Sequence, residues 1–347
     1  MKITQLRAVQ PATPGSPPDW RTQLGQIVVE VTTDEGCSGI GVGGGGLAGV
    51  HIIETVLRDL LLDQDPTDVE SWHARMCRHT AFYGQKGLVV MAISGVDLAL
   101  WDLRGKLLGQ PVARVLNKTV DLATALPTYR TVFDDVETEA ALDAGHAAVK
   151  LHVERFCDRP DPAAIADLVA RARDKLGPGR SLMIDAFGRW DVPSTLAVAA
   201  AIEPYQVDWL EEPLACDDLA GYEALKQSPV PIAGGEHEYL MGGFETLANA
   251  KLHAVLQPDI NWCGGMTTLV QIYALAKTTG LRVCPHRGSE TYALHAMAAL
   301  DPQPLAESPR EWFNVLQGSP SIRNGTIQLT DAPGFGIQVA PGIWASD

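Results

Sequence analysis

Three acidic residues each follow a short apolar run. Asp185 ends SLMID, Glu211 ends VDWLE and Glu236 ends VPIAGGE, with steps of 26 and 25 residues between them. Each step is long enough for one strand, one helix and two connections, so parallel strands would bring the three carboxylates to one rim. An all-oxygen ligand set suits a hard cation such as Mg²⁺. The spacing therefore predicts a metal site, whereas any one of these acids alone would be explained as a helix cap or an ion-pair partner.

A second pair of residues could move protons. Asp259 ends the run LHAVLQPD and His286 ends LRVCPH, which places them at the ends of two neighbouring predicted strands. A carboxylate that orients and charges an imidazole makes it a general base or acid near neutral pH. A lone histidine at a strand end is more often a structural hydrogen-bonding group, so the hypothesis of catalysis depends on Asp259.

Two further strand ends carry polar residues. Lys150 and His152 alternate in HAAVKLH, so both side chains are expected on the face of the strand that lines the barrel mouth. Lys150 could attract a substrate carboxylate or, if desolvated, act as a base, and both roles stay open. Glu307 ends QPLAE. Beside so many carboxylates it is expected to stay protonated and to donate a hydrogen bond to a developing anion, unless it caps the following segment.

The elements that position these residues follow one pattern. From about residue 124 the chain alternates between short apolar strands and amphipathic helices, giving seven or eight units, enough to close a modified (β/α) barrel. Residues 1 to about 45 have the alternation of a β-meander, and residues 50 to about 116 are predicted to be helical. Residues 320–347 return to short strands and turns.

Composition narrows the function classes. A chain of 347 residues with 46% hydrophobic content can form one large domain and a smaller one. The formal charge of −15 argues against nucleic acid or an anionic membrane as the partner. The longest apolar stretch, residues 196–202, is too short to span a bilayer, and the N-terminus lacks a signal-peptide pattern, so a cytoplasmic location is expected. The six scattered cysteines are expected to be free thiols.

A glycine run at residues 41–46 matches G-x-G-x-x-G between a strand and a helical segment. This motif is typical of dinucleotide-binding folds, where it lets the backbone approach a pyrophosphate. The preceding strand belongs to a meander, however, and a run of glycines satisfies the pattern easily. A nicotinamide-dependent oxidoreductase is therefore a minor alternative.

Several ordered motifs carry a resemblance to a known family. MID, WLEEPL, PIAGGEHEY, QPDINWCGG, CPHRGSE and NGTIQLTDAPGFGI make the chain resemble the enolase superfamily, in its mandelate racemase subgroup, over nearly its whole length. The resemblance implies a modified (β/α)₇β TIM-like barrel at residues 121–319. It also implies an α+β capping domain at residues 1–120, completed by residues 320–347.

The same resemblance implies a chemistry. Mg²⁺ would be held by Asp185, Glu211 and Glu236, and a base would remove the proton α to a substrate carboxylate. The motifs GGEHEY, QPDINWCGG and PHRGSE are most similar to rhamnonate dehydratase-like acid-sugar dehydratases, which are lyases of carbohydrate catabolism. This implies that His286, polarised by Asp259, takes the proton and then protonates the departing 3-hydroxyl to give a 2-keto-3-deoxy acid.

Substrate contacts are also implied by the resemblance. Glu307 would contact the substrate carboxylate, and Trp20 and Arg21 lie in a Pro- and Gly-rich loop that would cover the site. The substrate is expected to be a small sugar acid or another 2-hydroxy acid, and the protein a homo-oligomer.

Two departures from the family pattern limit this interpretation. Racemase-like members carry Lys-x-Lys where this chain has Lys150 and His152, and some dehydratases carry a histidine where this chain has Phe187. A racemase or epimerase of a 2-hydroxy acid, with His286 on one face and Lys150 or His152 on the other, is the alternative enzyme. A catalytically silent barrel that binds an anion is the alternative from another class.

Overall fold

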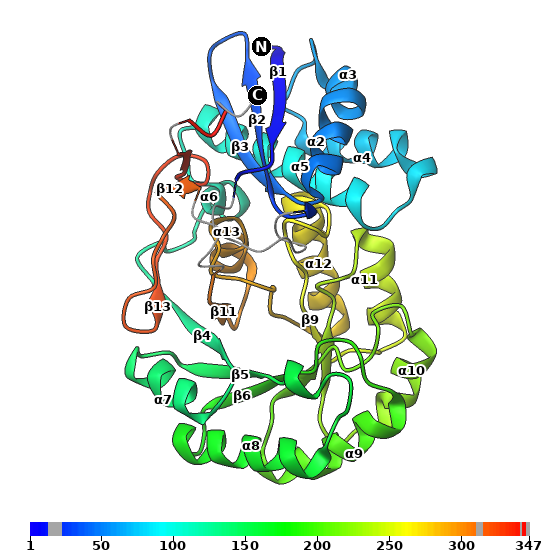
Figure 1. Ribbon diagram of the computed structural model, residues 1–347. Coiled ribbons are helices and arrows are strands. Elements are labelled where there is room, and N and C mark those ends of the chain that lie inside the picture. Colours follow the sequence, from blue (N-terminus) through cyan, green and yellow to red (C-terminus); the bar gives the residue numbers. More distant parts are fainter. Residues whose placement is uncertain (13–22, 310–314, 341, 345–347) are drawn as a thin grey trace.

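The computed structural model describes residues 1–347 except 13–22, 310–314, 341 and 345–347. The chain forms a barrel and a smaller part that lies over one side of it, at the top of Figure 1. Among the described residues, no helix combines the length and the apolar character needed to cross a membrane.

The smaller part contains an antiparallel sheet in the order β1 (Ile3–Val9), β2 (Ile27–Thr33) and β3 (Ser38–Gly43). The helices of this part are α2 (Gly46–His51), η1 (Ile52–Leu57), α3 (Arg58–Leu61), α4 (Val69–His79), η2 (Ala81–Tyr83), α5 (Leu88–Leu107) and α6 (Val112–Leu116). Helix α5 has 20 residues and is buried on most of its faces, because it lies between the sheet and the barrel.

The glycine run has a structural explanation. Gly39, Gly41 and Gly43 alternate along β3, and a Cβ atom on any of them would collide with the backbone of α5. The collisions fall at Ala99, Gly95 and Met91, one helical turn apart. Every second residue of β3 therefore faces every fourth residue of α5. The backbone of β3 lies directly against the backbone of this helix. The run serves close packing in an antiparallel sheet, so the dinucleotide-binding hypothesis loses its structural basis.

The barrel confirms the predicted fold class. In the described chain, eight parallel strands alternate with seven major helices. The strands are β4 (Leu126–Val132), β5 (Ala148–His152), β6 (Ser181–Asp185), β7 (Trp209–Glu211), β8 (Ile232–Gly234), β9 (Val255–Leu256), β10 (Arg282–Val283) and β11 (Ala306–Glu307). They are ordered β10-β9-β8-β7-β6-β5-β4-β11, with β11 parallel to β4. This is the (β/α)₇β arrangement.

The helices of the barrel cover its outer face, as α7, α8 and α9 do at the bottom of Figure 1. They are α7 (Asp135–Asp143), α8 (Pro162–Leu176), α9 (Val192–Ile202), α10 (Leu219–Ala224), α11 (Leu240–Asn249), α12 (Gly265–Thr279) and α13 (Thr291–Leu300), with short turns η3 (Glu154–Phe156), η4 (Glu203–Tyr205) and η5 (Leu225–Gln227). Asp134, Asp161 and Asp191 begin α7, α8 and α9 by accepting hydrogen bonds from first-turn amides.

The interior of the barrel is built in layers. One buried side chain from each strand or its immediate continuation forms a compact cluster: Tyr129, Ala148, Met183, Trp209, Ala233, Val255, Cys284 and Leu305. Side chains of a strand alternate between its two faces, so the residue two positions later also points inward. In most strands that next residue is polar, and these residues form the floor of the site.

The C-terminal segment contacts both parts of the molecule. Strands β12 (Leu316–Gln317) and β14 (Gln338–Val339) pair with each other, while β13 (Thr326–Ile327) pairs antiparallel with β4. The amide of Phe335 donates to Asp102 Oδ1 on α5 at 2.8 Å, and the Phe335 ring packs edge-on against His295 on α13.

Candidate active site

The polar floor of the barrel is centred on Lys150. Its Nζ lies 2.6 Å from Glu211 Oε1, 3.0 Å from Glu307 Oε1 and 3.3 Å from Asp185 Oδ2. The side chain is almost fully buried. Burial disfavours the ammonium, but the neighbouring carboxylates outweigh it and raise the pKa of Lys150 well above its usual value. Lys150 is therefore a charged group here, which favours the electrostatic alternative over the base.

Glu307 is ionised, which corrects the expectation of a protonated acid. Burial alone would raise its pKa, but the charges of Lys150 and His286 and the backbone N–H of Arg287 lower the pKa to about 2. Thr131 donates to Glu307 Oε1 at 2.8 Å, and the Arg287 N–H donates to Oε2 at 2.7 Å. The acids around Glu307 are visible in the sequence, whereas these hydrogen-bond donors come from distant residues.

His286 and Asp259 meet as predicted from their strand ends. His286 Nδ1 lies 3.1 Å from Asp259 Oδ2, and Asp259 is 1% exposed. On the other side of the ring, Nε2 lies 3.1 Å from Glu236 Oε2. A carboxylate at Nδ1 fixes the ring and favours Nε2 as the nitrogen that exchanges a proton with a ligand.

Glu236 belongs to a second cluster at the wall of the site. Glu212 Oε2 lies 2.7 Å from His237 Nδ1, and Glu236 Oε1 lies 3.5 Å from the same nitrogen. Burial and the charge of Glu212 raise the pKa of Glu236 to about 8. Burial alone would lower the pKa of His237, but its hydrogen bond with Glu212 and the charge of Glu236 raise it to about 9.

In an extended strand Glu212 would point away from its neighbour Glu211 and could only support it from behind. Its φ of 36° departs from extended backbone, and its side chain accepts from the Gly235 N–H and lines the cavity. In the described part of the chain, Glu212, Glu236 and His237 form the one group whose ligand atoms all lie within 4.8 Å of one another. The ligand atoms of the predicted set, Asp185, Glu211 and Glu236, do not all lie within this distance of one another. Lys150 contacts both Asp185 and Glu211.

His152 lies at the rim of the same cavity. Its Nε2 is 3.8 Å from Asp185 Oδ2, and its ring centroid is 5.4 Å from Phe133 and 5.3 Å from Phe187. Phe187 has a φ of 65°, a conformation that costs free energy for a residue with a Cβ atom. The ends of β4, β5 and β6 thus place three aromatic rings at the wall of the cavity across from His286.

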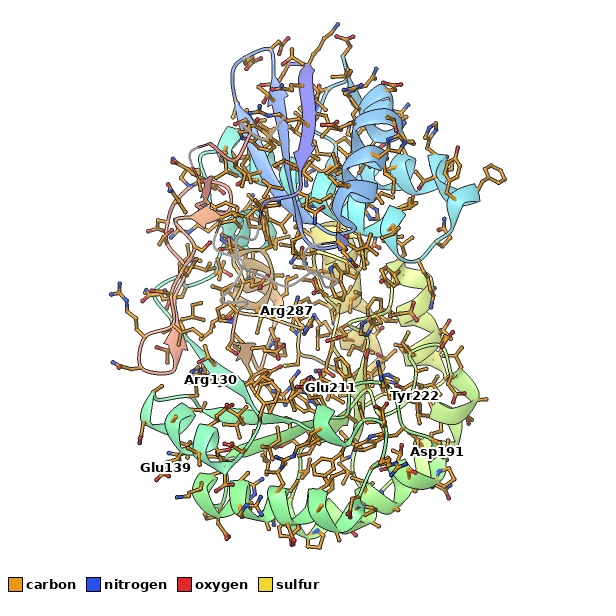
Figure 2. The ribbon with its side chains drawn as sticks, in the orientation of Figure 1. Arg130, Glu139, Asp191, Glu211, Tyr222 and Arg287 are labelled. Carbon is orange, nitrogen blue, oxygen red and sulfur yellow. The ribbon has the colours of Figure 1, made fainter. Side chains whose placement is uncertain are left out.

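Most of these groups line one cavity of about 1000 Å³, while Asp259 lies behind His286. Lys150, His152, Asp185, Glu211, Glu236, His286 and Glu307 line it, together with Arg130, Arg189 and Arg287. Figure 2 shows Glu211 and Arg287 inside the molecule, between the barrel helices and the smaller part, whereas Glu139 and Asp191 lie at the periphery. Trp20 and Arg21 lie outside the described residues.

Sequence reasoning missed several residues of the site. Gln257 Nε2 donates to Glu211 Oε2 at 2.6 Å, and Thr131 donates to Glu307. Both lie two positions after an inward-facing apolar residue, so strict alternation along the strand could have found them. Trp262, which lines the cavity beside His286, follows a strand end in a turn and has no such signal.

The donor chemistry suits a hard divalent cation. Six carboxyl groups belong to the site: Asp185, Glu211, Glu212, Glu236, Asp259 and Glu307. Lys150 is the lysine nearest to them, and the pKa of Glu236 is raised by burial first and by the charge of Glu212 second, so like charges face each other at that wall. Oxygen ligands with excess negative charge are what Mg²⁺ prefers, so the residues present fit this ion.

Comparison with known proteins now places the chain. Residues 135–343 match the family model described as "Enolase C-terminal domain-like", and residues 19–117 match the N-terminal domain of mandelate racemase / muconate lactonizing enzyme. The chain belongs to the enolase superfamily. Within it, the match to the N-terminal model confirms the mandelate racemase subgroup that the motifs indicated.

The relatives of this superfamily member include several acid-sugar enzymes. L-Rhamnonate dehydratase of Saccharopolyspora erythraea is 34% identical over 335 residues, which cover 92% of this chain and 84% of the relative. The structure of L-talarate dehydratase from a Polaromonas species, complexed with Mg and L-glucarate, superposes with a TM-score of 0.86 at 28% identity, covering 99% and 96% of the two chains. A racemase from Streptomyces coelicolor with bound magnesium has the same TM-score at 26% identity, covering 97% of each chain.

Proposed function

We propose that this protein is an Mg²⁺-dependent acid-sugar dehydratase, which converts a sugar acid to its 2-keto-3-deoxy product. The observation that carries the proposal is the orientation of His286. Asp259 holds Nδ1, while Nε2 faces a carboxylate-lined cavity large enough for a six-carbon acid. The dehydratases among the relatives support the same class of reaction.

Asp185, Glu211 and Glu236 would hold the metal ion, since all three line this cavity. When bound, Mg²⁺ would offset the negative charge that develops on the substrate carboxylate after the α-proton leaves. The relatives whose structures contain magnesium support the choice of this ion. Glu212 and His237 would hold Glu236 in place, because Glu212 contacts His237 and His237 in turn contacts Glu236.

The proton transfers are assigned to His286. Its Nε2 takes the proton from the carbon next to the carboxylate, and Asp259 stabilises the resulting imidazolium. The imidazolium then returns this proton to the 3-hydroxyl as the C3–O bond breaks, so one water leaves. The enol that remains tautomerises to the 2-keto acid. Lys150 stays charged and stabilises the anionic substrate end, close to Glu307.

Racemisation is the rival reaction, and a racemase among the structural relatives supports it. It needs a second proton-transfer group on the opposite face of the substrate. Lys150 is held as an ammonium by its carboxylate neighbours, which leaves His152 in that position. Because the wild-type sequence has no second lysine there, we favour dehydration.

A panel of sugar acids incubated with the protein and Mg²⁺ tests the proposal, with NMR detection of 2-keto-3-deoxy acids. We expect product from at least one acid, none after chelation of the metal, and none from His286→Asn. His79→Asn, which changes an exposed histidine at the end of α4, is the matched control and should retain the wild-type rate. Epimerised substrate without keto acid would favour the rival instead, and a protein that neither bound Mg²⁺ nor changed any acid would be a silent anion-binding barrel.

A further inference from the structure

Helix α12 begins directly after the turn that carries Asp259 and Trp262. Its first residue is preceded by Gly264, which has a φ of 118° and no side chain to cap the helix. The first N–H groups of a helix have no partner within the helix and need acceptors from elsewhere. Here those acceptors come from the smaller part of the molecule.

Helix α5 supplies them from one face. The Gly264 N–H donates to Ser94 Oγ at 2.9 Å, and the Thr267 N–H donates to Asp97 Oδ2 at 3.0 Å. The Thr267 hydroxyl donates to Asp97 Oδ1 at 2.6 Å. Trp101, one turn further along α5, donates from Nε1 to the same hydroxyl at 2.9 Å. A carboxyl group from another part of the chain thus caps this helix.

The capped end is tied to the proposed catalytic pair by a tight turn. The backbone oxygen of Asp259 accepts from the N–H groups of Trp262 at 3.0 Å and Cys263 at 2.8 Å. Its Oδ1 accepts from the Asn261 N–H at 2.8 Å, which leaves Oδ2 toward His286. Asp259, Asn261 and Cys263 are buried, so the turn between the cap and the Asp259 side chain is packed inside the molecule.

Close packing on both sides of the turn supports the same arrangement. A Cβ atom on Gly44 would lie 3.2 Å from Trp262 Nε1, and one on Gly265 would overlap Asp97. Glycine is therefore required at position 265, which also has a φ of 82°, whereas a side chain at position 44 would make Trp262 shift slightly. Burial raises the pKa of Asp97 to about 7, which shows that keeping a carboxyl group here costs free energy.

We infer that Asp97, together with Ser94, is a positioning residue for the Asp259–His286 pair. By holding the N-terminus of α12, it fixes the turn that aims Asp259 at His286 Nδ1. The inference deepens the proposed dehydration and rests on it. It assigns to the smaller part of the molecule a role in proton transfer, in addition to any role in covering the substrate.

Asp97→Ala and Asp97→Asn test the inference, with Asp102→Asn as the matched control. Asp102 lies on the same helix and is equally buried, but its carboxylate accepts from the N–H groups of Ile40 and Phe335, away from α12. We expect Asp97→Ala to lower kcat by about 10- to 100-fold with KM changed less than twofold, since small displacements of a proton-transfer group have effects of this size. The pH profile of kcat should also shift. Asp97→Asn, which keeps one acceptor oxygen, should fall in between.

Amide hydrogen exchange of residues 259–264 gives a readout that needs no substrate. Exchange should accelerate in Asp97→Ala and in Ser94→Ala, and should stay at the wild-type rate in Asp102→Asn, even where that variant is equally destabilised. A wild-type kcat and pH profile in Asp97→Asn and Ser94→Ala would overturn the inference, as would unchanged exchange of the turn. If the wild-type protein dehydrates no acid, the proposed function fails, and the exchange measurement still decides whether α5 holds the turn.

Discussion

Replacing Lys150 by Met tests the electrostatics of the site most sharply. Met retains the length and most of the apolar stem, but it removes the one ammonium that contacts Asp185, Glu211 and Glu307 at 2.6 to 3.3 Å. The lysine side chain is 2% exposed, so its ion pairs are buried. Breaking a buried ion pair by removing one partner costs roughly 3–5 kcal/mol. We expect a loss of this size in the free energy of unfolding of the metal-free protein.

Urea unfolding in the presence of a chelator measures this loss. Lys175→Met is the control, because its pair with Glu139 is exposed on both sides and should contribute nothing measurable. The difference between wild type and Lys150→Met should shrink as the pH falls from about 4.5 toward 2. Lys150 helps to lower the pKa of Glu307 to about 2, so the stability it contributes there is present above the unfolded pKa and is lost as the folded group becomes protonated. A loss no larger than that of the control would refute this account of the floor.

Two further predictions concern the scaffold. His295 Nδ1 accepts from the Ala113 N–H, and burial lowers the pKa of His295 to about 3. The neutral imidazole therefore contributes stability above pH 6.5, and this contribution is lost as the pH falls toward 3. His295→Asn can still accept this hydrogen bond but does not titrate. It should reduce the pH dependence of the free energy of unfolding by up to about 1.4 kcal/mol per pH unit, measured by urea titration. The same pH dependence as in the wild type would contradict this. Gly41→Ala should lower the free energy of unfolding by about 1–3 kcal/mol, because its Cβ would meet the Gly95 backbone, and a variant as stable as the wild type would contradict this. The wild type should also show no NADH binding by fluorescence.

Much of the barrel could be predicted because each strand is marked by a pattern of residues that are neighbours in the sequence. Each strand ends in a short apolar run, side chains alternate along it, and parallel strands bring their ends to one rim. This predicted the floor residues Lys150, Asp185 and Glu211 and the meeting of Asp259 with His286, with distances of 3.3 Å or less where they touch.

The remaining features depend on geometry that the sequence does not display. Glu212 enters the cavity because its backbone leaves the extended region at a φ of 36°. Glu307 is ionised because Lys150 on β5 and the Arg287 N–H, in the turn after β10, point at it. The capping of α12 by Asp97 joins residues 170 positions apart, and no local pattern predicts such a contact.

The central claim is that His286 moves the α-proton and that water is then lost. The most direct measurement uses a sugar acid that the wild type accepts, labelled with deuterium at C2, with Mg²⁺ present. We expect a primary isotope effect on formation of the 2-keto-3-deoxy acid. With His286→Asn, which should still bind Mg²⁺, we expect no product and no loss of label. Label that washes out of recovered substrate without keto acid, or dehydration at the wild-type rate by His286→Asn, would contradict it.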